Sequence, residues 1–125
     1  MIYGVGTDIA NITRMREMYE RQGERALQKI LASTEIALCE ASPDPARFLA
    51  KRFAAKEALG KAYGTGIREP LLLPEIAIEH DAMGKPEFSY SEKLAQFFAD
   101  KKLIAHLSIS DEREFAIAFV VLERA

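Results

Sequence analysis

The 125-residue sequence contains no tryptophan, five prolines and a single cysteine, Cys39. One cysteine can form neither an intrachain disulfide nor a cysteine-based zinc cluster, so we interpret Cys39 as a buried, inert thiol. The longest uninterrupted apolar run, residues 115–122, is far shorter than the ~20 residues of a membrane-spanning helix. The first residues also lack the basic segment and the long apolar stretch of a secretory signal. We therefore expect a cytoplasmic protein.

Neither sign of charge dominates, since 17 Lys and Arg oppose 19 Asp and Glu. The distribution is uneven, however: residues 1–68 carry 11 basic and 8 acidic side chains, whereas residues 69–125 carry 6 and 11. Residues 46–68 alone contain six basic residues and one acidic residue, Glu57. This pattern predicts an anion-binding surface in the first half of the chain. The length and the 49% apolar content favour one globular domain over residues 1–125.

The pattern of apolar residues predicts a helical first half and a sheet in the second half. The longest helix is expected over residues 46–63, rich in Ala, Lys, Glu and Leu and ended by Gly64-Thr65-Gly66. The last two strands are expected to form an antiparallel hairpin. The predicted fold class is α+β, with the helical first half packed on a mainly antiparallel sheet. The other predicted helices cover residues 24–31 and 33–40, and one more, capped by Asn11 or Thr13, ends near residue 22. A short helix with Ser89 and Glu92 as its capping box is expected to end near residue 101. The predicted strands are residues 2–9, 75–80, 86–90, 103–110 and 115–122.

Two places carry residues suited to metal and phosphate chemistry. Asp8 follows Gly-Val-Gly-Thr at the end of the first strand, where a carboxylate can ligate Mg²⁺ or cap the next helix. Glu57 and Lys61 lie four residues apart on one helix face, shortly before the Gly-Thr-Gly turn. Lysine and a Gly-rich turn suit a bound phosphate, although a solvated surface ion pair is the alternative. The sequence has neither a P-loop nor G-x-G-x-x-G, which argues against kinase-like and dinucleotide-binding folds.

A third polar segment is residues 106–111, His-Leu-Ser-Ile-Ser-Asp. Strand alternation places His106, Ser108 and Ser110 on one face. A serine hydrolase is disfavoured because no G-x-S-x-G nucleophile elbow occurs, which leaves a ligand-lining strand or a half-exposed sheet face. Aromatic side chains at core-like positions leave few rings on which nucleic-acid bases could stack; these are Phe48, Phe53, Phe115 and Phe119.

Three stretches together resemble the bacterial holo-acyl-carrier-protein synthases, the small stand-alone 4′-phosphopantetheinyl transferases. They are MIYGVGTDI at residues 1–9, FLAKRFAAKEALGKAYGTGI at residues 48–67 and HLSISD at residues 106–111. The similarity extends in order over nearly the whole chain. The resemblance implies transfer of 4′-phosphopantetheine from coenzyme A to a serine of apo-acyl carrier protein, in fatty acid biosynthesis. Adenosine 3′,5′-bisphosphate would be the other product.

The resemblance also implies roles for individual residues. Asp8 and Glu57 would be Mg²⁺ ligands, with Lys61 at the coenzyme A phosphates and Arg52 at the 3′-phosphate. Arg14 and Arg21 would meet the acidic carrier protein. The family is typically a homotrimer with active sites between subunits. The segments that would line the coenzyme A pocket contain Gly64, Thr65, Gly66, His106 and Ser108.

The sequence leaves two questions open. The base that deprotonates the serine could be Glu57, Asp8 through a metal-bound water, or His106. The function could also be that of another Mg²⁺-dependent enzyme acting on a nucleotide diphosphate. A non-enzymatic anion- or RNA-binding domain using residues 46–68 is the remaining alternative.

Overall fold

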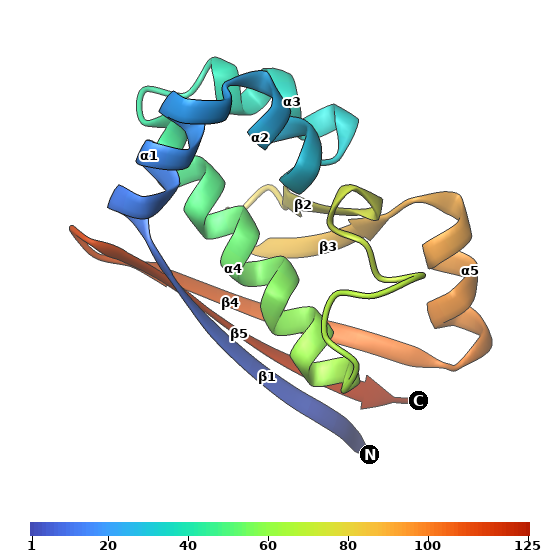
Figure 1. Cartoon of the computed structure of the whole chain (residues 1–125). Helices are drawn as coiled ribbons and strands as arrows, with labels where there is room; N and C mark the ends of the chain where they lie inside the picture. The colour runs from blue at the N-terminus through green and yellow to red at the C-terminus, as the bar shows by residue number, and fades with distance from the viewer.

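The computed structural model describes all 125 residues and lays one long helix across a three-stranded antiparallel sheet (Figure 1). The sheet has the order β1-β5-β4, formed by Ile2–Asn11, Phe115–Arg124 and Leu103–Asp111. The first strand of the chain is thus paired with the last strand, and both termini lie at the same end of the sheet (Figure 1). The expected antiparallel hairpin is formed by β4 and β5.

The long helix α4, Pro45–Tyr63, packs on the inner face of this sheet. The Asp44 side chain caps its first turn by accepting a hydrogen bond from the Arg47 amide, and Gly64 ends it with a positive φ of 109°. Its buried face is rich in alanine, and Ala50, Ala54 and Ala58 are fully inaccessible to solvent. Small side chains let the helix axis approach the sheet closely, which matters for the site described below.

The remaining elements surround α4. Helices α1 (Ile12–Gln22), α2 (Glu24–Ile30) and α3 (Ser33–Glu40) gather around its N-terminal half (Figure 1). A second, two-stranded antiparallel sheet joins β2 (Ile76–His80) to β3 (Pro86–Tyr90), preceded by the short 3₁₀ helix η1 (Leu73–Glu75) and followed by α5 (Glu92–Asp100). One cluster of 26 buried apolar residues runs through these layers. The α+β class is confirmed, and no helix combines the length and apolar character needed to span a membrane.

Two predicted helix caps are wrong. Asp8, offered as an alternative cap, does not cap α1, because β1 continues past it and pairs Asp8 with Ala118. The predicted cap Asn11 is confirmed, since its side chain accepts a hydrogen bond from the Arg14 amide at 3.0 Å. Ser89 does not cap α5 either. It lies inside β3 opposite Ala77, and the capping side chain is that of Ser91.

The outer face of the three-stranded sheet is apolar and not covered by any other element. Two aromatic residues that we expected in the core lie on this face. Phe115 and Phe119, expected in the core, are 38% and 46% exposed. Alternation along β5 turns Ala116, Ala118 and Val120 toward α4, so the phenylalanines face outward. Phe48 and Phe53 do pack against the core, as expected. Cys39 is fully buried, and burial raises the pKa of its thiol to about 11, which confirms the inert-thiol interpretation.

Candidate functional site

The site begins with a close contact between β1 and α4 that requires glycine. A Cβ added at Gly6 would lie 2.0 Å from the carbonyl oxygen of Ala58, and one at Gly4 would lie 2.0 Å from that of Ala62. No side chain larger than hydrogen fits at such distances. The two glycines therefore let the strand backbone lie directly on the helix. The next inward-facing residue of the strand, Asp8, is brought beside the last turns of α4.

Asp8 meets Lys61 at this contact. The Lys61 Nζ donates to Asp8 Oδ1 at 2.9 Å and to the Thr7 carbonyl at 3.0 Å. The Asp8 side chain is 15% exposed, whereas that of Lys61 is 52% exposed. The Lys61 ammonium is thus held by Asp8 and Thr7 on the protein side, and its other side is open to solvent. Helix spacing suggested an ion pair between Glu57 and Lys61. In the structure Lys61 pairs with Asp8 of β1 instead.

Glu57 completes a pair of carboxylates. Burial raises its pKa, the negative charge of Asp8 raises it further, and Lys61 opposes both effects. The repulsion from Asp8 means that the two carboxylates share one electrostatic environment, which a divalent cation would relieve. No cluster of three or more His, Cys, Asp or Glu side chains exists that could hold a metal alone. A two-carboxylate oxygen site fits Mg²⁺, which usually keeps waters and binds substrate phosphates in its other positions.

The raised pKa of Glu57 gives a test that needs no substrate. Because folding raises its pKa above the ordinary 4.5, the stabilising contribution of the bound proton is fully present below 4.5. That contribution is lost as pH rises through the higher pKa of the folded state. Glu57→Gln removes the charge, so we expect the metal-free variant to melt at a higher temperature than wild type near neutral pH. Thermal unfolding with a chelator should show this gain shrinking to nothing below pH 4.5, and a gain that does not vary with pH would contradict it.

The Gly64-Thr65-Gly66 turn folds back on the end of α4. The Gly66 amide donates to the Gly60 carbonyl at 3.0 Å, and a Cβ on Gly60 would lie 2.8 Å from the Gly66 carbonyl carbon. The Thr65 hydroxyl donates to the Gly66 carbonyl and remains exposed. The Gly64-Thr65-Gly66 segment therefore lies at the same end of α4 as Lys61, about one helical turn further along the chain. Its role at the phosphates stays a prediction.

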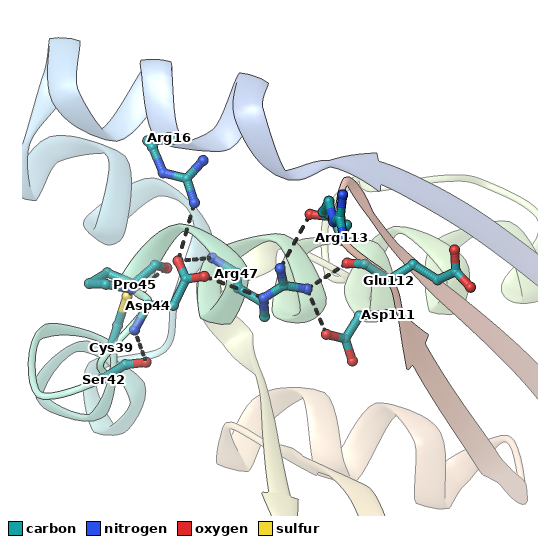
Figure 2. A network of polar contacts seen from close by, with 9 residues as sticks. All are labelled: Arg16, Cys39, Ser42, Asp44, Pro45, Arg47, Asp111, Glu112 and Arg113. Atoms are coloured by element: carbon teal, nitrogen blue, oxygen red, sulfur yellow. Dashed lines mark hydrogen bonds and ion pairs between the residues drawn. The ribbon is translucent and has the colours of Figure 1, made fainter.

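The basic segment 46–68 is divided among several partners, so most of its charge is not free. Arg47 donates to Asp44 at 3.3 Å, to Asp111 at 2.8 Å and to the carbonyls of Glu112 and Arg113 at 2.6 and 3.2 Å (Figure 2). These contacts fasten the tip of the β4–β5 hairpin to the start of α4. The sequence left the role of Asp111 undefined. In the structure its carboxylate is the ion-pair partner of Arg47 at the hairpin tip.

Arg52 does not join Asp8, Glu57 and Lys61. Its guanidinium is 3.2 Å from Glu35 Oε2, and the residue is only 7% exposed. It does line a pocket of about 300 Å³ near the start of α4, together with Phe48, Lys51 and His80. Burial lowers the pKa of His80, and the nearby charges of Arg52 and Lys51 lower it further, whereas Asp81 opposes them. The predicted role of Arg52 at a 3′-phosphate stays a prediction, with the pocket as its place.

His106 and Ser108 lie on the outer face of β4, on the side of the sheet away from α4 and the Asp8 site. His106 Nε2 is 2.9 Å from Glu123 Oε1, and Ser108 is opposite Phe119. No Ser–His pair is formed, in agreement with the argument against a serine hydrolase. Within one chain these two residues are separated from Asp8 by the sheet. Arg14 and Arg21 are exposed on α1 and form no ion pair.

The comparisons with known proteins agree on one family. Residues 4–120 match the family described as the 4′-phosphopantetheinyl transferase superfamily. A protein from Dechloromonas aromatica named holo-[acyl-carrier-protein] synthase is 55% identical over 125 residues, covering 100% of both chains. The crystal structure of such a synthase from Neisseria meningitidis is 42% identical with a TM-score of 0.95, covering 99% of this chain and 100% of that one.

A further solved structure was determined with a ligand. The Bacillus anthracis holo-(acyl-carrier-protein) synthase in complex with CoA (3′,5′-ADP) is 36% identical with a TM-score of 0.83, covering 100% of this chain and 99% of that one. The family match covers most of the sequence, and the identity to the relatives extends over their full length. Both findings agree with the architecture and with the resemblance of the three sequence stretches. The chain belongs to the 4′-phosphopantetheinyl transferase superfamily.

Proposed function

We propose that this protein transfers 4′-phosphopantetheine from coenzyme A to a serine hydroxyl of an apo-acyl carrier protein. The observation that carries the proposal is the meeting of Asp8, Glu57 and Lys61 at the β1–α4 contact, in a chain that belongs to this transferase family. Relatives at up to 55% identity bear the synthase name, and one was solved with coenzyme A or its nucleotide part. Residues 1–125 would act as one domain in the cytoplasm and supply carrier protein for fatty acid biosynthesis.

Asp8 and Glu57 would hold Mg²⁺, whose charge, when bound, offsets the negative charge that develops around the transferring phosphoryl group. Lys61 contributes a second positive charge next to them. Because Asp8 and the Thr7 carbonyl fix the Lys61 ammonium, it is already in place for pyrophosphate oxygens and needs little reorganisation. The Gly64-Thr65-Gly66 turn leaves backbone open to the same ligand.

The serine oxygen forms a bond to the β-phosphorus of coenzyme A as the bond to the bridging oxygen breaks. Adenosine 3′,5′-bisphosphate leaves with that oxygen, and the serine proton needs an acceptor. Glu57, and Asp8 through a metal-bound water, are the two candidates that lie at the β1–α4 contact. The third candidate, His106, lies on the other face of the sheet and is paired with Glu123, so within one chain it is the least suited.

The test is incubation with coenzyme A, Mg²⁺ and apo-acyl carrier protein, followed by the intact mass of the carrier. We expect the carrier to gain one phosphopantetheine. Cleavage of coenzyme A without an adduct would favour the alternative of an enzyme hydrolysing a nucleotide diphosphate. Neither cleavage nor adduct, together with retention of RNA on a filter, would favour the non-enzymatic binding domain.

The exposed arginines of α1 support docking of an acidic carrier. Arg14 and Arg21 carry no internal partner, so their charge is available to a protein surface. We expect Arg14→Glu to raise the KM for carrier protein about tenfold and to leave the KM for coenzyme A nearly unchanged. Steady-state kinetics with each substrate varied in turn would measure both constants. Lys85→Glu, a charge reversal in the β2–β3 turn, is the control, and equal changes in both constants for Arg14→Glu would exclude the docking role.

The apolar outer face of the three-stranded sheet supports the proposed homotrimer. Apolar faces of this extent are normally covered by a partner. His106 and Ser108 lie on this same face, so a neighbouring subunit could bring them to a shared pocket. The exposed apolar residues of the face are Val5 (55%), Ile9 (59%), Ile104 (49%), Phe115 (38%), Ile117 (42%) and Phe119 (46%).

We expect Phe119→Asp to dissociate the assembly and to abolish transfer, because a carboxylate would be buried without a partner in the interface. Light scattering after size-exclusion chromatography would report the mass of each species. Met83→Asp is the control, since Met83 is 92% exposed in the β2–β3 turn. A wild-type protein that elutes as a fully active monomer would contradict the proposal.

A further inference from the structure

Three buried charged residues lie apart from the Asp8–Glu57–Lys61 site. Glu35 is 1% exposed, Arg52 is 7% exposed and Lys56 is fully buried. Glu35 Oε1 accepts hydrogen bonds from Lys56 Nζ at 2.7 Å and from the Ala32 amide at 2.9 Å. Glu35 Oε2 accepts from the Ile78 amide at 2.9 Å and from Arg52 Nη1 at 3.2 Å. Burying charges is expensive unless they are paired and hydrogen-bonded, and each oxygen of Glu35 accepts two such bonds.

The two cations of the cluster are used differently. Lys56 directs its ammonium entirely inward, to Glu35, to the Ile30 carbonyl at 2.7 Å and to the Leu73 carbonyl at 3.1 Å. An ammonium has three donors, so Lys56 is fully satisfied and has none left for a ligand. Lys56 therefore does not contribute to the anion-binding surface that the charge of residues 46–68 predicted.

Arg52 keeps donors in reserve. Both of its hydrogen bonds, to Glu35 and to the Ile78 carbonyl, come from Nη1. A guanidinium carries donors on Nε and Nη2 as well, and these have no acceptor within the protein. The Phe48 ring packs on the guanidinium with its centroid 4.4 Å from Cζ. The Arg52 guanidinium is therefore held by hydrogen bonds at its Nη1 edge and by the Phe48 ring on one face.

The free edge of Arg52 belongs to the wall of the pocket at the start of α4. Phe48 and Ile78, the residues that hold the guanidinium, line the same pocket. The other cations there are partly neutralised, since Arg47 pairs with Asp44 and Asp111, and Lys51 Nζ is 3.7 Å from Asp111. The carboxylate partner of Arg52 lies in the protein interior, behind the guanidinium. Arg52 is thus the one nearly buried cation of this pocket with unused donors.

We propose that Glu35 is a positioning residue that fixes Arg52 so that its free guanidinium edge binds a phosphate monoester in this pocket. The proposal rests on the proposed function, in which that monoester is the 3′-phosphate of coenzyme A. A guanidinium bound to a buried carboxylate at one edge cannot swing away, so its other donors stay aligned for phosphate oxygens. Glu35 would then determine discrimination between coenzyme A and 3′-dephospho-coenzyme A without touching either.

The test compares these two donors in Glu35→Gln. We expect the KM for coenzyme A to rise roughly tenfold and that for 3′-dephospho-coenzyme A to change less than about twofold, with kcat preserved. The double variant Glu35→Gln/Lys56→Met guards against misfolding, because it has the same net charge in the cluster as wild type yet lacks the carboxylate. It should lose discrimination in the same way. Lys56→Met alone leaves the Arg52 anchor in place and should keep it.

Direct binding separates a failure of this proposal from a failure of the proposed function. Calorimetric titration with adenosine 3′,5′-bisphosphate and with AMP needs no transfer activity. We expect wild type to prefer the bisphosphate and both Glu35 variants to lose most of that preference. Unchanged preference in a folded Glu35 variant, or an equal loss of affinity for both nucleotides, would overturn the positioning role even if wild type transfers phosphopantetheine. Absence of transfer with the preference intact would overturn the proposed function alone.

Discussion

Replacing Asp8 by Asn or Glu57 by Gln is expected to lower kcat/KM for phosphopantetheine transfer by about 10²- to 10³-fold. Each substitution removes one of only two carboxylates that could hold a metal at the β1–α4 contact. Each keeps the shape of the side chain, so packing should be preserved. For Glu57 the expected loss of activity accompanies a gain in thermal stability, which separates a functional defect from misfolding.

The measurement is the initial rate of holo-carrier formation at a series of Mg²⁺ concentrations. Both variants should need more Mg²⁺ than wild type as well as turning over more slowly. Glu40→Gln is the matched control, because Glu40 is an exposed carboxylate at the end of α3 with no ion pair. Wild-type rates and Mg²⁺ dependence in either site variant would remove that residue from the metal site.

Gly6→Ala is expected to damage both stability and activity. The new Cβ would fall 2.0 Å from the Ala58 carbonyl oxygen, so β1 must move away from α4. Overpacking of this kind destabilises by about 1–3 kcal/mol, which lowers the Tm by several degrees in a chain of this size. The movement also withdraws Asp8 from Lys61, and a displacement of ~1 Å at a catalytic group can reduce the rate about 10²-fold.

Calorimetry and the transfer assay would measure the two effects together. Gly84→Ala is the control, since Gly84 has a positive φ of 88° but no atom lies within 4 Å of a Cβ added there. That variant should lose some stability through backbone strain and keep its activity. A Gly6→Ala protein as active as wild type would show that the close strand–helix contact does not position the site.

Much of the fold was predictable because local signals agree with the tertiary structure. Helix α4 has a proline at its start, an alanine-rich interior and glycine at its end, and both boundaries are within a residue of the expected ones. The alternation in β4 correctly separated buried Leu103 and Leu107 from exposed His106. Among the site residues, Asp8 and Lys61 were found as separate motifs, and the structure brings them together.

What could not be predicted depends on contacts distant in sequence. Apolar alternation shows that Phe115 and Phe119 share a face of β5, but not which face α4 covers. Helix spacing offered Glu57 as the partner of Lys61, whereas the close approach of β1 supplies Asp8. Only the fold shows that Arg47 reaches across to Asp111 (Figure 2).

Glu35 was missed altogether, although one signal was available. Lys56 lies seven residues after buried Leu49 and four residues before buried Gly60, on one stripe of α4. A lysine on a buried stripe requires a buried carboxylate, and Glu35 is one of few acids in the first half of the chain. Its identity still could not be fixed, because the choice depends on how α3 packs on α4.

We expect the Asp8–Glu57–Lys61 site to couple cleavage of coenzyme A to modification of a carrier serine. The most direct measurement quantifies adenosine 3′,5′-bisphosphate and holo-carrier in the same reaction, with Mg²⁺ present and with Mg²⁺ removed by a chelator. We predict that the two products form in equal amounts with Mg²⁺ and that neither forms without it. Nucleotide released without an equal amount of holo-carrier, or transfer that persists in the chelator, would contradict the account.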